Sequence, residues 1–237
     1  MPKFADIRAR AAKRKGGDAV LKKLLGAMPD NKGLDRIGDD RILSTMAERV
    51  FAAGFVWRVI EQKWPGFEAA FLGFEPKRLL FQPDEFWEGL ARDERIVRNP
   101  QKIRSVRDNA AFVERVSKEH GSFGKFLAAW PADDQVGLIA YLGKHGSRLG
   151  GNTGQYFLRW LGWDTFILSG DMVLALRDAG LEIAPSPTSK KDLAAIQAQM
   201  NAWAKETKLP RAHISRILSM SIGENRPAGE LLSYMGE

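Results

Sequence analysis

The sequence predicts an all-α fold, and three observations lead to this prediction. Apolar residues recur at spacings of three and four along most of the chain, as they do on the buried face of an amphipathic helix. No alternating apolar and polar pattern typical of a strand runs for more than a few residues. No segment repeats another. With 237 residues, the chain can bury a sizeable core in one large domain or two small ones.

The first 32 residues form a basic segment with few apolar side chains. Its cations gather at residues 8–15 and at Lys22 and Lys23, and the Gly16-Gly17 pair and Pro29 limit it to two short helices at most. Two interpretations of this arm stay open. It is a solvated or partly disordered tail, or it adds salt-dependent affinity for phosphate.

The clearest helical pattern begins at Asp39, with apolar residues at 42, 46, 50, 53 and 57, and with Asp39 or Asp40 placed to cap it. A second pattern, at residues 67–74, stops at Pro76. Further helices are expected over 84–90, 106–116, 122–130, 133–144, 155–161, 169–179, 191–205 and 210–219, with a linker at 185–189. The predicted organisation is an arm (1–32), a core (33–184) and C-terminal helices (185–237) that pack on the core.

Composition narrows the function classes. Lys and Arg number 36 against 29 Asp and Glu, a net charge of +7 that favours a polyanionic partner. The chain has no Cys, which excludes disulfides, thiol nucleophiles, iron–sulfur clusters and cysteine zinc sites. The three His residues lack ligand spacing, so neither a metal nor another cofactor is expected. Without a secretory signal pattern or an apolar run of about 18 residues, we expect a cytoplasmic protein with no membrane partner.

The most informative stretch is a glycine-rich bend at residues 146–153, between two predicted helices. Glycines let the backbone approach a ligand closely, and the amides that open the following helix suit a phosphate oxygen. Lys144, His145 and Arg148 add cations around the bend. An ordinary αα-hairpin accounts for the same pattern, so the bend alone leaves both interpretations open.

The stretch LGGNTGQYFLRW (149–160), followed by Asp171 eighteen residues after Thr153, resembles the helix-hairpin-helix signature of DNA glycosylases. The upstream half is similar to the DNA-3-methyladenine glycosylase I family in particular. The similar segments are AGFVW (53–57), FEAAF (67–71), FEP (74–76), RIVR (95–98), KI (102–103) and NA (109–110). Together the motifs cover residues 39–180. The resemblance implies a two-lobed helical fold with a damaged base flipped into a cleft between the lobes.

The resemblance also implies that Asp171 is catalytic. A carboxylate there would stabilise the positive charge that develops on deoxyribose as the N-glycosidic bond breaks, or orient the attacking water. The alternative is an ordinary helix cap. Asn152 stands where bifunctional members of the superfamily carry a lysine that forms a Schiff base, so a strand-nicking step is not expected and the enzyme is predicted to be monofunctional.

A base must leave the duplex before its glycosidic bond can be cleaved, and aromatic side chains hold the flipped base. Trp57 falls at the stacking position of the family. The other expected pocket residues are Glu48, Phe51, Phe55, Tyr156 and Trp160. Aromatic residues at helical spacing are commonly core residues instead, and Glu48 either binds a base edge or pairs with Arg49 or Arg41.

Residues 92–107 hold six cations against two carboxylates, and the resemblance implies that this segment touches the DNA backbone. A solvated charged face is the alternative. The residues expected to bind the DNA backbone are Lys144, Gly146, Arg148, Gly150, Gly151, Asn152, Thr153, Arg98 and Lys102.

The sequence departs from the DNA-3-methyladenine glycosylase I family in several features. The aromatic segment that precedes the helix from Asp39 in the family is missing here, and Asp171 matches the broader superfamily better than the zinc-bearing family, in which this aspartate is not evident. The family holds a structural zinc with Cys and His ligands near both termini, and this chain lacks those ligands. Its base-reading glutamate would fall at Arg49, one position after Glu48. The prediction is a monomeric glycosylase of base excision repair that acts on double-stranded DNA with a damaged base, an alkylated purine by resemblance. A non-catalytic helix-hairpin-helix DNA-binding protein and an unrelated helical scaffold are the alternatives.

Overall fold

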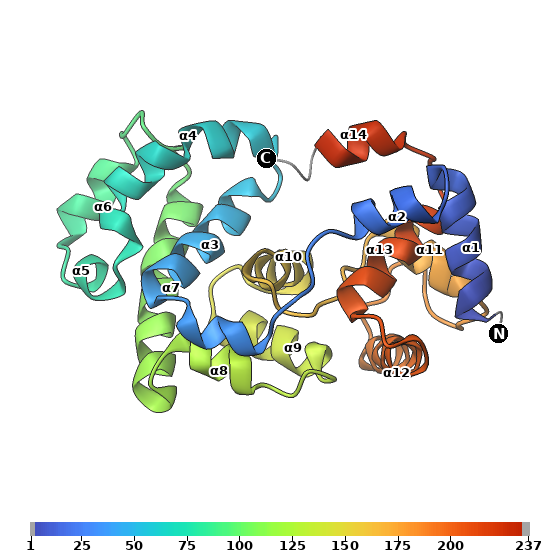
Figure 1. Cartoon of the computed structure of the whole chain (residues 1–237). Coiled ribbons are helices and arrows are strands. Elements are labelled where there is room, and N and C mark those ends of the chain that lie inside the picture. Colours follow the sequence, from blue (N-terminus) through green and yellow to red (C-terminus); the bar gives the residue numbers. More distant parts are fainter. Residues whose placement is uncertain (1–2, 234–237) are drawn as a thin grey trace. The chain divides into compact units, whose positions relative to one another are not determined.

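The computed structural model describes residues 3–233, and these form helices with no strand among them (Figure 1). The all-α prediction is confirmed. The helices divide into two units, one comprising 3–29, 133–136 and 164–233 and the other comprising 30–132 and 137–163. This division differs from the expected arm, core and C-terminal helices, because both ends of the chain belong to one unit. Within the described residues, no helix is long and apolar enough to cross a membrane.

The second unit carries the upstream motifs and the glycine-rich bend. Its helices are η1 (Lys32–Arg36), α3 (Asp39–Ala52), α4 (Trp57–Ala70), η2 (Leu72–Phe74), α5 (Pro76–Leu80), α6 (Asp84–Leu90), α7 (Pro100–His120), α8 (Phe123–Ala129), α9 (Gln135–His145) and α10 (Gly151–Leu161). The first two residues of α9 belong to the other unit. Helix α3 packs against both α7 and α10, so it is the central helix of this unit.

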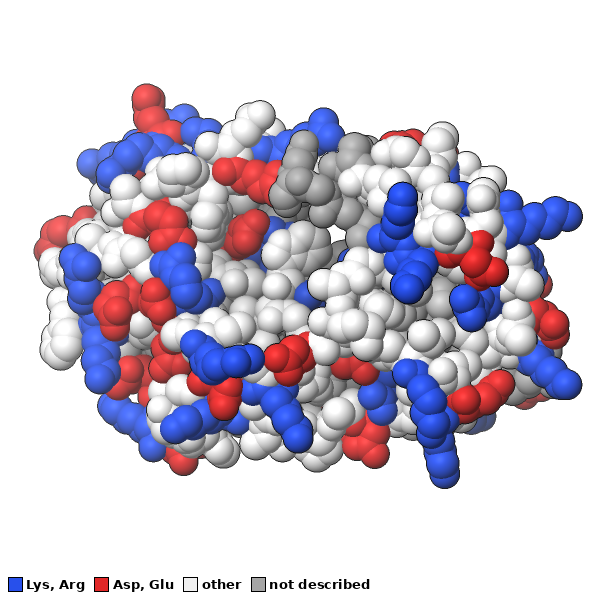
Figure 2. Space-filling view, viewed as in Figure 1, with Lys and Arg blue, Asp and Glu red and all other residues white. Residues whose placement is uncertain are grey.

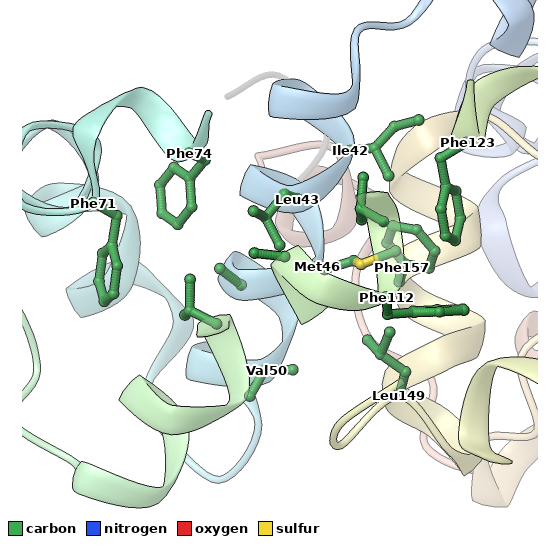
Figure 3. Packing of buried hydrophobic residues seen from close by; sticks show 14 of the residues in the cluster. Ile42, Leu43, Met46, Val50, Phe71, Phe74, Phe112, Phe123, Leu149 and Phe157 are labelled. Carbon is green, nitrogen blue, oxygen red and sulfur yellow. The ribbon is translucent and has the colours of Figure 1, made fainter. Parts of the chain in front are cut away.

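Aromatic and aliphatic side chains fill the core of the second unit. Met46 of α3 lies close to Phe112 of α7 and Phe157 of α10 (Figure 3), and all three are buried. Phe71 and Phe74 stack with ring centroids 5.3 Å apart. Burying one such side chain contributes roughly 1.5–3 kcal/mol, so this core accounts for the apolar spacing seen along α3 and α4.

Two helix boundaries differ from the apolar pattern. The expected helix through Trp57 instead ends at Ala52, and α4 begins at Trp57. Gly54, between them, has φ +76°, a conformation that glycine adopts readily and that other residues resist. Pro76 does not end a structured region, since it stands at the start of α5, where its missing N–H costs nothing.

Asp39 does not cap its own helix, contrary to expectation. Gly38 occupies the N-cap of α3, and the Asp39 carboxylate accepts hydrogen bonds from the hydroxyl of Ser117 and from the N–H of Phe123 at 2.9 Å. The side chain therefore joins the start of α3 to the end of α7 and the start of α8. These tertiary partners are far away in the sequence, and no local pattern indicates them.

An ion pair joins α3 to α4. Arg41 donates from Nη1 and Nη2 to the two carboxylate oxygens of Glu68, at 2.8 and 3.0 Å. Ser44 Oγ donates to Glu68 as well, at 2.7 Å. A bidentate guanidinium–carboxylate pair fixes the orientation of both groups, so this contact sets how the two helices meet.

The first unit joins the two ends of the chain. Its helices are α1 (Phe4–Lys15), α2 (Asp18–Leu25), α11 (Gly170–Asp178), α12 (Lys190–Thr207), α13 (Arg211–Ser221) and α14 (Ala228–Ser233). Helix α13 packs against α1 and α11. The core of this unit includes Phe4 and Ile7 of α1 together with Phe166 and Trp203, so the N-terminal segment is folded into the unit and is not a solvated tail.

Several cations of the N-terminal segment bind inside the first unit. Arg10 donates to the Asp178 carboxylate at 2.8 Å, and Arg14 and Lys15 donate to backbone carbonyl groups between residues 220 and 226. Some of the cations counted in the sequence therefore stabilise the fold and are not available to bind phosphate.

We expect Glu68→Gln to destabilise the protein by about 1 kcal/mol at neutral pH, because Gln cannot form the bidentate pair with Arg41. Burial raises the pKa of Glu68, but the hydrogen bonds from Arg41 and Ser44 outweigh it and hold the pKa below its ordinary value of 4.5. The stabilisation is thus present above that value and disappears as the pH falls through the folded pKa.

Urea denaturation of wild type and Glu68→Gln from about pH 7 to about pH 3 measures this effect. The difference in unfolding free energy should shrink only at the acid end. Glu88→Gln, at an exposed carboxylate of α6, is the control and should show no such difference. A Glu68 effect that does not change with pH would contradict the role of the ion pair.

Candidate functional site

The expected helix-hairpin-helix is formed by α9, a turn and α10. Helix α10 begins at Gly151, four residues before the expected start, and no side chain caps its first amides. The first N–H groups of a helix have no partner within the helix. Lys144, Arg148, Gly150, Gly151 and Asn152 are exposed at the turn, while Gly146 and Thr153 are half-buried. The turn thus presents both backbone amides and cations to solvent.

Three glycines allow the turn between α9 and α10 to pack closely within the hairpin. A Cβ on Gly143 would lie 3.2 Å from the Cα of Gly150, and a Cβ on Gly154 would lie 2.3 Å from the carbonyl oxygen of Leu149. A Cβ on Gly146 would lie 2.6 Å from Leu149 Cδ1. Packing inside the hairpin therefore accounts for Gly146, which was expected at the DNA backbone.

Asn109 fastens the turn to α7. Its Nδ2 donates to the carbonyl oxygen of Ser147 at 3.0 Å, and its Oδ1 accepts from the N–H of Ser147 at 2.7 Å. The next residue, Arg148, has φ +61° and donates to the side chain of Gln101. Asn109 belongs to one of the motifs of the sequence, but its structural role depends on a contact 38 residues away.

Lys102 is not placed for the DNA backbone, contrary to expectation. It is buried, and its Nζ donates to the carbonyl oxygens of Phe51 at 3.0 Å and Ala53 at 2.6 Å. Burial lowers the pKa of Lys102, and the charge of Arg148 lowers it further. The ammonium group therefore holds the end of α3 beside the hairpin.

The other cations of residues 92–107 are divided between internal pairs and solvent. Arg95 binds Asp93 at 2.6 Å and Arg107 binds Asp84 at 2.7 Å. Arg98 is exposed and lies 3.9 Å from Glu94. On the face drawn in Figure 2, Lys and Arg are interspersed with Asp and Glu. Arg98, with Lys144 and Arg148 of the hairpin, thus remains a candidate for phosphate contact in this unit.

The aromatic residues expected in the base pocket divide into core and surface. Phe51 is fully buried, so it cannot stack on a base and its expected place in the pocket is corrected. Trp57 is half-buried. Phe55, Tyr156 and Trp160 are 46%, 40% and 54% exposed. Part of each of these three rings is accessible to a planar ligand, and Lys102 Nζ lies over the Phe55 ring, 4.5 Å from its centroid.

A guanidinium group lies over the ring of Trp160. The Cζ of Arg49 is 4.1 Å from the ring centroid, and Arg49 also donates to Glu48. Arg49 is only 8% exposed, and its Nε has no hydrogen-bond partner among the described residues. Burial raises the pKa of Glu48, and the charge of Arg49 offsets this only in part. The pairing of Glu48 with Arg49 is therefore the one that forms, since Arg41 binds Glu68.

Asp171 lies in the first unit, at the second position of α11. Ser169 caps this helix, and its Oγ accepts from the N–H of Met172 at 3.2 Å. The interpretation of Asp171 as the helix cap is thereby corrected. Its side chain is exposed and lies against Gly223, where a Cβ would be 2.3 Å from Asp171 Oδ1. Sequence reasoning did not find Gly223, because nothing local relates it to Asp171.

We expect Lys102→Met to lower the melting temperature by about 5 °C, because two carbonyl groups lose a charged donor. The salt dependence of its affinity for duplex DNA should equal that of wild type. Arg98→Gln should leave the melting temperature unchanged. The slope of log affinity against log salt concentration should become smaller in magnitude by about one. Fluorescence anisotropy over a salt series measures the slopes, and a reduced slope in Lys102→Met would show that Lys102 binds phosphate after all.

Residues 31–138 match the model of a family described as methyladenine glycosylase. The chain is also similar to 3-methyladenine DNA glycosylase I from Staphylococcus aureus, with 22% identity over 53% of this chain and 77% of that chain and a TM-score of 0.48. A variant of 3-methyladenine DNA glycosylase I in complex with 3-methyladenine shows 23% identity over 57% of this chain and 79% of that chain, with a TM-score of 0.47.

The matched region contains α3, the segment 53–57 and all of α7, and it ends within α9, before the turn of the hairpin and Asp171. A zinc site with cysteine ligands does not fit this chain, which has no Cys. The match confirms the resemblance that the motifs predicted: residues 31–138, a little under half of the chain, match the methyladenine glycosylase family.

Proposed function

We propose that this protein removes a damaged base, an alkylated purine, from double-stranded DNA by flipping it out and hydrolysing its N-glycosidic bond. The observation that carries the proposal is the family match over residues 31–138. In this proposal the protein acts as a monomer, in the cytoplasm, in the first step of base excision repair.

Backbone phosphates would bind at the hairpin of the second unit. The uncapped amides that open α10 carry the positive end of the helix dipole, which favours an anionic oxygen. Lys144 and Arg148 are exposed beside them, and Arg98 is exposed near the start of α7. Contacts of this kind position a protein on DNA without reading its sequence.

The flipped base would contact the exposed aromatic residues. Phe55 and Trp57 lie in the matched region, and Tyr156 and Trp160 follow on α10. Purines alkylated at a ring nitrogen carry positive charge, and cations are attracted to the face of an aromatic ring. The Arg49 guanidinium over Trp160 is paired with the Glu48 carboxylate, so the pair offers the base a dipole with no net charge.

Asp171 would assist the chemical step. As the bond between the base and C1′ breaks, its electron pair leaves with the base, which departs neutral when the alkylated purine was cationic. Positive charge then develops on the sugar, where a carboxylate stabilises it, orients the water that attacks C1′ and accepts the proton that this water loses. Asn152 offers no amine for a Schiff base, so the product is an intact strand with an abasic site.

We expect wild type to release 3-methyladenine or 7-methylguanine from alkylated duplex DNA. Asp171→Asn should lower the single-turnover rate by about 100-fold or more, while its affinity for the duplex stays within about twofold of wild type. Asp192→Asn is a matched control, since Asp192 also lies in the first turn of a helix capped by a serine. That variant should keep the wild-type rate.

A panel of duplexes with uracil, hypoxanthine or oxidised bases distinguishes another lesion from no chemistry. If wild type binds these duplexes but releases no base from any of them, the protein is a non-catalytic DNA-binding protein. Release that is equal in wild type and Asp171→Asn would keep the glycosylase and remove Asp171 from its mechanism.

A further inference from the structure

Gly223 lies directly against the carboxylate of Asp171, although 52 residues separate them in the sequence. A Cβ on Gly223 would lie 2.3 Å from Asp171 Oδ1 and 2.9 Å from its Cγ. Non-bonded atoms do not approach this closely, so any other side chain would push the carboxylate away. Gly223 also has φ +68°, which other residues adopt only with strain.

Helix α1 holds the segment that contains Gly223. Arg14 donates from Nε to the carbonyl oxygen of Met220 at 3.1 Å and from Nη2 to that of Gly223 at 2.7 Å. Asn225 donates back to the carbonyl oxygen of Arg14 at 3.2 Å. The backbone on both sides of Gly223 is thereby bonded to the C-terminal end of α1.

Lys15 completes this attachment. Its Nζ donates to Asn225 Oδ1 at 3.0 Å and to the carbonyl oxygen of Arg226 at 2.7 Å, and the residue is only 5% exposed. Burial lowers the pKa of Lys15, as does the charge of Arg14, while the carboxylates of Asp171 and Glu230 raise it. A buried ammonium group needs such partners, and here one of the charges that it interacts with is that of Asp171.

We propose that Gly223 and Lys15 are positioning residues for Asp171: Lys15 holds the segment in place, and Gly223 provides the space in which the carboxylate keeps its direction. This inference rests on the proposed function, in which Asp171 assists hydrolysis. Both residues lie outside the matched residues 31–138. The two ends of the chain would therefore supply a part of the catalytic apparatus that the matched region does not contain.

Gly223→Ala tests the contact in a duplex base-release assay. The single-turnover rate should fall about tenfold or more, while duplex affinity stays within about twofold of wild type. Gly162→Ala is the matched control, because Gly162 also has a positive φ, of +93°, but a Cβ there would meet no described atom within 4 Å. It should lose a similar amount of stability and keep the wild-type rate.

A double variant shows whether Gly223 acts through Asp171. If it does, Gly223→Ala should cause no further loss of rate in an Asp171→Asn background. Losses that multiply in the double variant would mean that Gly223 acts by another route and would overturn the proposal.

Carboxyl NMR tests the same contact without any substrate. In protein labelled with 13C at the aspartate carboxyl groups, the Asp171 resonance is identified by its loss in Asp171→Asn. It should shift in Gly223→Ala and in Lys15→Met, and stay in place in Gly162→Ala. If Lys15→Met does not fold, the Asp171 resonance in Gly223→Ala still tests whether Gly223 contacts the Asp171 carboxylate.

The two tests separate the two proposals. A wild type that releases no base from any duplex defeats the proposed function, whereas an Asp171 resonance that does not move in Gly223→Ala defeats the positioning role.

Discussion

A buried cation must find hydrogen-bond acceptors, and this requirement shapes both units of the protein. In the second unit, the ammonium group of Lys102 binds the carbonyl groups of Phe51 and Ala53, where α3 ends. In the first unit, Lys15 binds the segment that ends at Arg226. An unsatisfied charge in the interior costs several kcal/mol. Each lysine therefore fixes a stretch of backbone at or just beyond the end of a helix, next to a candidate functional residue.

The matched family region and the proposed catalytic carboxylate lie in different parts of the chain. Residues 31–138 provide α3, the exposed loop with Phe55 and all of α7. The turn of the hairpin, α10 and Asp171 follow the match in the sequence. The pair formed by Glu48 and Arg49 stands where the resemblance places one base-reading glutamate, and Arg49 covers a face of Trp160. Recognition of the base in this protein would therefore involve an ion pair where the family has a single carboxylate.

Net charge did not indicate which cations belong to the candidate site, for a physical reason. The excess of cations favours an anionic partner, but composition does not say which cations remain free. Arg10, Arg14 and Lys15 bind inside the first unit, and Arg95, Lys102 and Arg107 bind inside the second. A folded chain uses cations to satisfy its own carbonyl groups and carboxylates, and most of these partners, unlike the Asp93 partner of Arg95, are distant in sequence.

The sequence by itself determined the helical class, most helix positions, the hairpin and the resemblance to a family, because apolar periodicity and short motifs are local properties. The helices expected over 122–130, 169–179 and 191–205, for example, correspond to α8, α11 and α12. Only the tertiary structure decided that Phe51 is core while Phe55 is exposed, that Lys102 faces carbonyl groups, and that Gly223 meets Asp171. Burial and long-range contacts depend on how the helices pack. Apolar residues on the same face of a helix look alike in the sequence, and only the packing decides which of them are buried.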